Sequence, residues 1–421
     1  MPPTLPASAP ASDRTGKGFG MLAVLGPGLV VMLADTDVGS VITAGQSGLQ
    51  WGYRLLLLQV VLMPILYMVQ ELTVRLGIFT GRGHGELIRD TFGPVWAWVS
   101  AAGLAVACVG ALLTEFSGVA GVGELYGVPR LLSVSLAALA LLAVALTGSY
   151  RRVERIAIVF GLFEFSFFGV AWAAHPDLAT MATQSVDIRL ANTDYLYLVA
   201  ANIGAVIMPW MVFYQQSAIA DKQLQPRHFR AARIDTAIGA VVTQLVMAAV
   251  LIAVAATLGH DANRSASLGS VGEISAALTP FLGDRAGKLV FGMGVVGAGL
   301  VAAIVASLAL AWGLGEVAGF RRSLKDRPLQ APLFYGCYAA CVIGGALLVA
   351  LLPDLVALNI GVQVMNALLL PLVLGFLVAL AARALPEPVR LRGWYLWVVC
   401  AVAGLTSALG VWGGLSGAFG G

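Results

Sequence analysis

The stretch VVMLADTDVGSVITAGQSG, residues 30–48, begins as an apolar helix and then places two carboxylates, Asp35 and Asp37, near its middle. A charged Asp at the centre of a bilayer costs about 2.5–3.5 kcal/mol on insertion scales. The stretch contains no Lys or Arg that could offset this charge. We therefore interpret Asp37 as a cation ligand, aided by carbonyls freed where the helix unwinds at Gly39. The alternative is a hydrogen-bonded Asp that serves packing.

The composition of the whole chain explains why a bilayer is the relevant solvent. Its 421 residues are 59% hydrophobic and 11% charged, with a mean hydropathy of +0.88. Soluble proteins are about 25% charged. We expect an all-α, multi-pass integral protein of a bacterial or archaeal-type cytoplasmic membrane, whose constant partner is the lipid bilayer. No basic patch interleaved with aromatic residues predicts nucleic-acid binding, and no obligate protein partner is evident.

Apolar segments long enough to span the membrane predict about eleven transmembrane helices. Of the 25 Lys and Arg residues, 19 fall on one side if the N-terminus lies inside. Because positive residues favour the cytoplasmic side, we predict an N-in, C-out topology. The predicted spans are 20–45, 55–76, 95–127, 130–149, 154–174, 193–219, 235–259, 287–317, 331–352, 355–382 and 394–417.

Two of these segments, the first and the sixth, are interrupted near their middle by Gly, Pro and polar residues. Five segments separate corresponding positions, so the two halves have opposite orientations, as in transporters with inverted repeats and broken helices. The expected organisation is a disordered cytoplasmic tail at 1–18, a first repeat at 19–175, an inverted second repeat at 190–383, and an extra helix at 393–418.

In the sixth segment, Pro209 has no backbone N–H and is expected to free carbonyls one turn back, near Ala205 and Val206. Met208 beside it could offer a thioether to a softer metal, although packing is the commoner role of such a Met. In the first segment, an unwound chain would let Asp35 reach the same site as Asp37, either as a ligand or from a vestibule. Two carboxylates and carbonyls suit a hard divalent cation such as Mg²⁺ or Mn²⁺.

Both interrupted segments carry motifs by which the chain resembles the NRAMP divalent-metal transporters. The family motif Asp-Pro-Gly-Asn corresponds to Asp37-Val38-Gly39-Ser40. The family motif Gly-Ala-x-x-Met-Pro-His corresponds to the seven residues from Gly204 to Trp210. The resemblance extends over roughly residues 20–385 and implies a LeuT-like fold, an inverted 5+5 repeat with broken helices 1 and 6.

The resemblance also implies a site for the transported metal. The ligands would be the Asp37 carboxylate, the residue at Ser40, the Ala205 carbonyl and the Met208 sulfur. Gln363 corresponds to a family glutamine that approaches the metal in one conformation. An interhelical hydrogen bond is the alternative role of Gln363. We expect no cofactor, since Mg²⁺ or Mn²⁺ is the transported substrate.

Departures from the family pattern concern the proton path. Two family histidines of the sixth segment become Trp210 and Gln215, and of two acids in the third segment Glu115 remains while Gly118 replaces the other. Trp210, Glu115 and Gln215 are therefore candidates for gating or coupling. These departures resemble the divergent NRAMP-related magnesium transporters, which implies uptake of Mg²⁺ and Mn²⁺ by alternating access without proton coupling.

Other classes of protein fit the sequence less well. A proton-coupled Mn²⁺/Fe²⁺ NRAMP transporter stays open because Met208 favours softer metals. A Na⁺-coupled amino-acid transporter would meet repulsion between Asp37 and the substrate carboxylate. An enzyme is not expected, because no histidine lies inside a predicted span to pair with a nucleophile or an acid. Intramembrane acids without cationic partners argue against a receptor or scaffold.

Overall fold

The computed structural model describes residues 27–146, 155–156, 158–159, 161–258, 283–351 and 356–419. These residues form helices and contain no strand. The predicted tail at 1–18 and most of the predicted loop at 260–286 lie outside the described residues. The elements are α2 (Pro27–Asp35), α3 (Val38–Trp51), η1 (Gly52–Leu55), α4 (Leu56–Thr80), α5 (His84–Phe92), α6 (Pro94–Leu125), α7 (Arg130–Leu146), η2 (Leu162–Phe165), α9 (Ser166–Ala173), α10 (Leu178–Ser185), α11 (Thr193–Val206), α12 (Pro209–Lys222), η3 (Pro226–His228), α13 (Phe229–Thr257), α15 (Asp284–Ala318), α16 (Pro332–Leu351), α17 (Val356–Arg383), η6 (Glu387–Val389) and α18 (Gly393–Phe419).

Within the described part of the chain, 8 helical stretches are long and apolar enough to cross a membrane. Two shorter apolar helical stretches, Arg130–Leu146 and Leu162–Ala173, fall in the predicted fourth and fifth spans. Each of the eleven predicted ranges contains described helix. The number of crossings and the N-in, C-out topology stay predictions.

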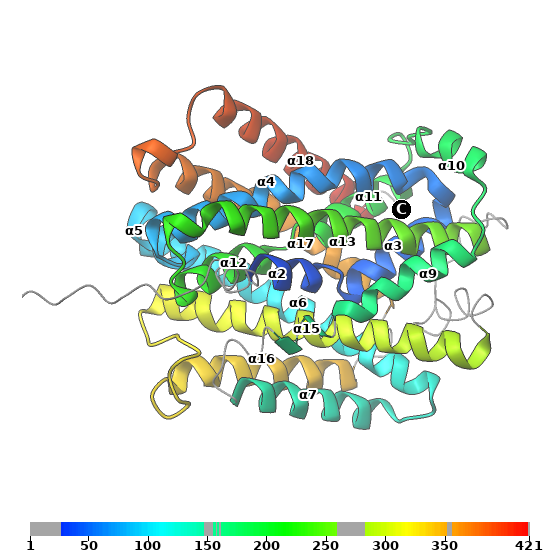
Figure 1. Ribbon diagram of the computed structural model, residues 1–421, viewed down its shortest axis with the longest axis horizontal. Coiled ribbons are helices and arrows are strands. Elements are labelled where there is room, and N and C mark those ends of the chain that lie inside the picture. The colour runs from blue at the N-terminus through cyan, green and yellow to red at the C-terminus, as the bar shows by residue number, and fades with distance from the viewer. Residues whose placement is uncertain are drawn as a thin grey trace, which may run out of the picture.

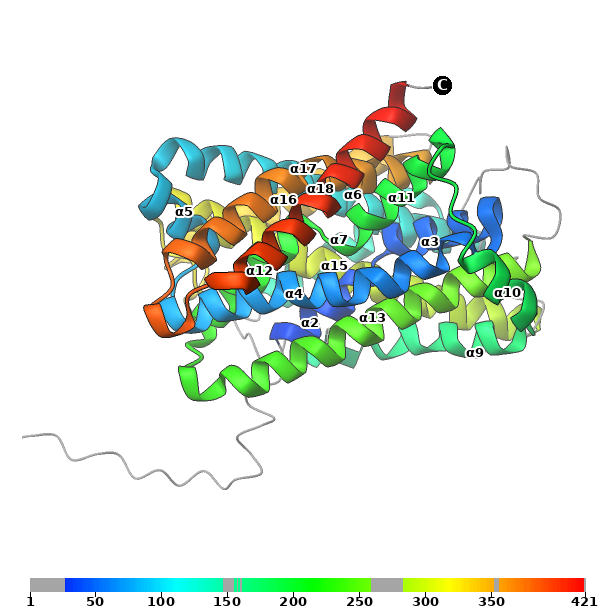
Figure 2. The same ribbon diagram turned by 90° about the horizontal axis from the view of Figure 1, so that it is seen from above.

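The long helices run side by side along the long axis of the molecule (Figures 1 and 2). The short helices α5 and α10 lie at opposite ends of this bundle (Figures 1 and 2). On α7, the large apolar side chains of Leu131, Leu136 and Leu139 are more than half exposed. Such a surface suits contact with lipid, because hydrocarbon tails accept apolar side chains without cost.

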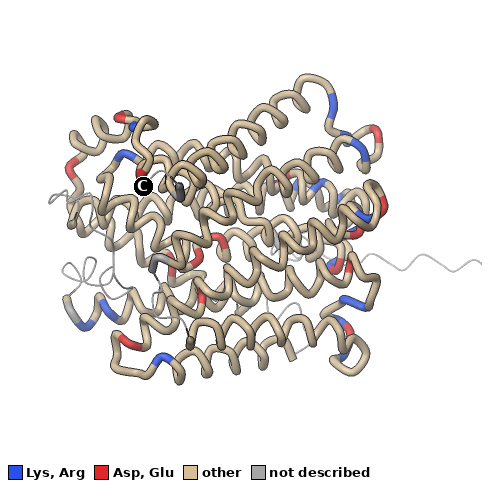
Figure 3. Tube along the Cα trace, turned by 180° about the vertical axis from the view of Figure 1, so that it is seen from behind, with Lys and Arg blue, Asp and Glu red and all other residues tan. Residues whose placement is uncertain are grey.

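The two broken segments lie in the interior and run antiparallel to each other. Helix α2 contacts α12, and α3 contacts α11. The ends of α2 and α11 therefore meet the starts of α3 and α12 near the middle of the bundle. Acidic positions occur in this central region, while Lys and Arg gather toward the ends (Figure 3). The fold thus brings both interruptions to one place.

Candidate functional site

The first interruption lies at Thr36 and Asp37, between the end of α2 and the start of α3. Asp37 is extended (φ −70°, ψ 172°), and its Oδ1 accepts a hydrogen bond from the Ser40 N–H at 2.6 Å. An Asp in this position stabilises the first turn of a helix, so the chain can resume α3 at Val38. The expectation that the helix unwinds at Gly39 was wrong, because Gly39 is already inside α3.

The second interruption lies at Ile207 and Met208, between α11 and α12. Met208 is extended (φ −93°, ψ 140°), and Pro209 occupies the first helical position of α12. A residue with an N–H at position 209 could continue the α-helical ladder to the Ala205 carbonyl, but proline cannot. The prediction that Pro209 breaks the sixth segment and frees a carbonyl at Ala205 is confirmed.

One hydrogen bond joins the two interruptions directly. The Ser40 hydroxyl donates to the Ala205 carbonyl at 3.0 Å. Ser40 lies in the first turn of the helix that Asp37 caps, so this contact brings the Ala205 carbonyl, which is outside the helical ladder, to the same region as Asp37. The Asp37 Oδ2 is buried and has no hydrogen-bond partner. Three oxygen donors from two broken segments therefore converge, as a cation site requires.

Gln363 of α17 lies against the same place. A Cβ at Gly39 would collide with the Gln363 side-chain amide, and one at Gly204 would collide with the Gln363 carbonyl. The Gln363 Oε1 accepts a hydrogen bond from Asn366 at 3.0 Å, while Nε2 is buried without a partner. Gly39 thus serves close approach of the glutamine rather than unwinding.

Glu115 of α6 lies next to Asp37. Its Oε2 accepts a hydrogen bond from the Val38 N–H at 3.2 Å, and its Oε1 accepts one from the Thr114 hydroxyl at 2.9 Å. The carboxyl groups of Glu115 and Asp37 are electrostatic neighbours. One turn further along α6, a Cβ at Gly118 would collide with the Val38 side chain.

The other coupling candidates lie further along α12. Trp210 is fully buried, and its indole Nε1 has no hydrogen-bond partner. Gln215 receives a hydrogen bond from Thr73 of α4 and donates one to Thr236 of α13 at 3.1 Å. Gln215 therefore links three helices, two turns away from Met208.

All nine candidate residues are at most 1% exposed. The described residues contain no group of three or more His, Cys, Asp or Glu side chains arranged to hold a metal ion. A cation at the interruptions would therefore rely on a mixed set of donors, with the Asp37 carboxylate joined by a hydroxyl, a carbonyl and the Met208 thioether. Such a set suits transient binding better than permanent retention.

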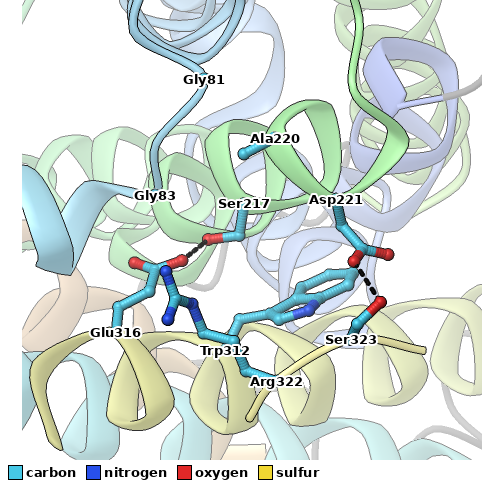
Figure 4. A pocket seen from close by; sticks show the side chains of 9 residues that line it. All are labelled: Gly81, Gly83, Ser217, Ala220, Asp221, Trp312, Glu316, Arg322 and Ser323. Carbon is cyan, nitrogen blue, oxygen red and sulfur yellow. Dashed lines mark hydrogen bonds between the residues drawn. The ribbon is translucent and has the colours of Figure 1, made fainter. Parts of the chain in front are cut away.

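Sequence reasoning missed a polar cluster at the α5 end of the bundle. Glu316 of α15 accepts hydrogen bonds from the Ser217 hydroxyl at 2.5 Å and the Gly85 N–H at 2.8 Å. It lines a pocket of about 200 Å³ that Trp312 and Arg322 also line (Figure 4). The sequence did contain a signal for this cluster. Glu316 is an acid within the apolar range 287–317, and acids inside membrane spans are expected to be functional, as was argued for Asp37.

His84, the first residue of α5, is the second missed residue. It is fully buried, and its Nδ1 lies 2.9 Å from the Gln216 Oε1. Gln216 Nε2 already donates to the Arg82 carbonyl at 3.0 Å, so the ring Nδ1–H is the donor to Oε1. Burial lowers the pKa of His84 to about 4, although the hydrogen bond to Gln216 opposes the shift. The imidazole is neutral at physiological pH.

Comparison with known proteins identifies the family. The model of the family described as "Natural resistance-associated macrophage protein-like" (Nramp) matches residues 28–416. The chain belongs to the Nramp family. The "Divalent metal cation transporter MntH" of Aeromonas hydrophila is 30% identical over 301 residues, which cover 68% of this chain and 72% of that protein. The protein of the same name from Pectobacterium carotovorum is 29% identical over 308 residues, 71% of this chain and 73% of that one.

Solved structures agree with the fold of this Nramp protein. The manganese transporter of Eremococcus coleocola, in complex with an aromatic bis-isothiourea substituted compound, superposes with a TM-score of 0.77 at 20% identity. The match covers 98% of this chain and 90% of that one. A Na⁺-coupled sialic acid symporter matches with a TM-score of 0.58 at 13% identity, over 96% and 91% of the two chains. The expected all-helical, LeuT-like fold is confirmed.

Family membership settles the class of this Nramp protein. It is an integral, multi-pass membrane transporter and not an enzyme.

Proposed function

We propose that this Nramp protein is a secondary transporter that takes up divalent metal cations by alternating access around the two interruptions. The observation that carries the proposal is the convergence of Asp37, the Ser40 hydroxyl and the freed Ala205 carbonyl in the buried interior. The names of the curated relatives, divalent metal cation transporters, support the same class of substrate.

The ligand set would hold the cation between the two broken segments. Asp37 supplies the negative charge, Ser40 and Ala205 supply neutral oxygens, and Met208 supplies a thioether. Gln363, whose Nε2 has no partner, would shift so that its amide oxygen reaches the cation in another conformation. Rocking of the broken segments against the remaining helices would then open the site to either side in turn.

We further propose that the cations are Mg²⁺ and Mn²⁺. Mg²⁺ dehydrates reluctantly and keeps several waters when it binds. The short Ser40 side chain leaves more room for such waters than a longer amide would. The oxygen donors suit both ions, while Met208 extends the range toward Mn²⁺.

Uptake would be driven by the membrane potential rather than by protons. A negative-inside potential contributes about 2.3 kcal/mol per charge per 100 mV, and twice that for a divalent ion. In the described spans no histidine occurs beside the interruptions that could carry a proton away. The second candidate is proton-coupled Mn²⁺/Fe²⁺ transport. It is favoured by the contact between Glu115 and Asp37, where a proton could be exchanged.

The proposal is tested in proteoliposomes that contain a Mg²⁺-sensitive dye or a pH dye, at a fixed negative-inside potential. We expect Mg²⁺ entry that Mn²⁺ competes for, without acidification of the lumen. Entry of Mn²⁺ but not of Mg²⁺, together with acidification, would replace the proposal by the proton-coupled candidate.

Asp37→Ala tests the site within the same assay. We expect this variant to lose uptake of both metals, because Asp37 is the only acid in the proposed ligand set. Glu387→Gln, a change of an acid in η6 at the protein surface, is the matched control and should transport normally. Normal uptake by a folded Asp37→Ala variant would overturn the site assignment.

A further inference from the structure

A second group of buried oxygens lies at the end of α2, next to the site described above. It consists of the carboxyl groups of Asp35 and Glu164 and the hydroxyl of Thr36. Each of these residues is at most 1% exposed. Both Asp35 oxygens, Glu164 Oε1 and Thr36 Oγ1 are buried without a hydrogen-bond partner. Buried polar atoms are normally satisfied, so four such atoms in one place call for a ligand.

The backbone brings these groups together through the packing of η2 on α2. A Cβ at Gly161 would collide with the Leu33 side chain, so η2 can lie this close only because residue 161 is glycine. The Thr36 hydroxyl faces Glu164, and Glu164 interacts electrostatically with Asp35. Asp35 is the last residue of α2, whose final carbonyls carry the negative end of the helix dipole.

The charges around this group favour a cation. The electrostatic neighbours of Asp35 are Asp37 and Glu164, and those of Glu164 include Asp37. No Lys, Arg or His is among the groups that act on either carboxyl. Acidic positions without basic neighbours also stand out in the centre of the described bundle (Figure 3). Half-helix C-terminal ends in broken transporter helices are known places for coordinated cations.

We propose that Asp35, Thr36 and Glu164 form a second position for a hard divalent cation, beside the position at Asp37. The donors are two carboxylates, a hydroxyl and the carbonyls at the end of α2. They include no sulfur, so this second position takes Mg²⁺, Mn²⁺ and Ca²⁺ by the same oxygen chemistry. The inference rests on the proposed function, because it supplies a second step in the path of the same ion.

Two neighbouring positions have a consequence for the movement of the ion. Two dications at short distance repel each other, so the second ion binds more weakly than the first. Multi-site binding with such repulsion lets an ion leave a site that otherwise holds it firmly. The second position would therefore speed release of the ion from Asp37.

The test is a titration of the purified protein in detergent with Mn²⁺, followed by the electron paramagnetic resonance signal of the free ion. We expect two Mn²⁺ per chain in the unaltered protein, one tighter and one weaker. Glu164→Gln should retain one ion and weaken the other by about tenfold or more, since one ligand charge is removed. Asp37→Ala should retain the ion that depends on Glu164.

Glu124→Gln is the control, because Glu124 is an exposed acid at the end of α6 that pairs with Arg130. It should bind two ions. Gel filtration and the thermal unfolding midpoint establish that each variant is folded, and Glu164→Asp, which keeps the charge, should restore the weaker ion.

The outcomes separate this inference from the proposed function. A single Mn²⁺ in the unaltered protein, or two ions bound as tightly as before in a folded Glu164→Gln variant, overturns the second position. The proposed function remains intact in that case if the unaltered protein takes up Mg²⁺. Absence of both binding and uptake in the unaltered protein overturns the proposed function itself.

Discussion

Ser40 contributes a single, short hydroxyl side chain to the interior. The hydroxyl reaches the Ala205 carbonyl at 3.0 Å, while its own N–H is held by Asp37. Ser40 thus joins the two broken segments. Under the proposed function, its side chain would also limit how close a hydrated cation comes to Asp37. We therefore expect the size of this side chain to affect the selectivity between cations.

Ser40→Asn should shift the preference away from Mg²⁺. The longer amide fills space that waters on Mg²⁺ would occupy, and it removes the hydroxyl that bonds to Ala205. We expect Mg²⁺ uptake to fall more than Mn²⁺ uptake, measured by competition between the two ions in proteoliposomes. Ser185→Asn, at the end of α10 and away from the interruptions, is the control. An equal fall for both ions in Ser40→Asn would count against the proposed role of size.

His84 should make stability depend on pH. Its pKa of about 4 in the folded protein lies below its ordinary value of 6.5, so the unfolded chain binds more protons between these values. Stability is then lost as the pH falls from about 6.5 toward 4, by at most about 1.4 kcal/mol per pH unit. The measurement is the thermal unfolding midpoint in detergent between pH 7 and pH 5.

The variant His84→Gln should show a flatter dependence on pH than the unaltered protein, since the other titrating groups are common to both. His175→Asn, at an exposed position after α9 where the backbone φ is 45°, should keep the original slope. Parallel curves for His84→Gln and the unaltered protein would contradict the assignment of the slope to His84.

At the scale of elements, the two interruptions are built by different means. The first relies on Asp37 as a helix cap, so that α3 starts immediately after the break. The second relies on Pro209, which removes the N–H that would bond to Ala205. Sequence alone predicted the second break correctly, because proline acts through its own backbone. It misplaced the first, because Gly39 looked like the breaking residue while its contact with Gln363 depends on a helix more than 300 residues away.

Pro209→Ala tests whether the second break is needed for transport. The new N–H at position 209 can donate to the Ala205 carbonyl, which would compete with Ser40 and with a cation for the same oxygen. We expect uptake to fall several-fold while the thermal unfolding midpoint is maintained or raised. The control is Pro64→Ala, since Pro64 lies inside α4 on an exposed surface.

A fall in uptake of the same size in Pro64→Ala would indicate a general effect of removing proline from a long helix. Unchanged uptake in Pro209→Ala would show that the freed carbonyl is not required.

In the molecule as a whole, the two ends of the bundle differ in the polar contacts that join their helices. At the α10 end, Arg54 and Arg189 form ion pairs with Asp187, and their hydrogen bonds lower the pKa of that partly exposed carboxyl to about 2. At the α5 end, the cluster around Glu316 joins α5, α12 and α15. Such buried polar contacts at one end would have to rearrange if that end opens.

The topology predicted from Lys and Arg can be measured directly. In a background with the four native cysteines replaced by alanine, Thr183→Cys of α10 should react with a membrane-impermeant maleimide added outside intact cells. Arg230→Cys, at the start of α13 near the α5 end, should react only after the cells are permeabilised. The reverse pattern would invert the predicted orientation.

How much of this could be predicted from the sequence depends on how local the signal is. The helical spans, the proline break and the ion pair of Glu71 with Arg75, at 2.6 Å, follow from neighbouring residues. The contacts between Ser40 and Ala205, and between Glu164 and α2, join distant segments. The first was reached through the family resemblance, and the second was not predicted. Side-chain partners across 100 residues or more are set by packing, which a single sequence does not display.

The fit between Val38 and Gly118 constrains how this lineage can change. Because the branched side chain of Val38 occupies the volume above residue 118, an acid cannot return there while Val38 is present. Reversal must begin at position 38, where a smaller or cyclic residue would first have to be tolerated beside the Glu115 contact. The combination of Val38 with an acid at 118 is excluded in either direction, so a change from the family pair to the present one must likewise place glycine at 118 before valine at 38.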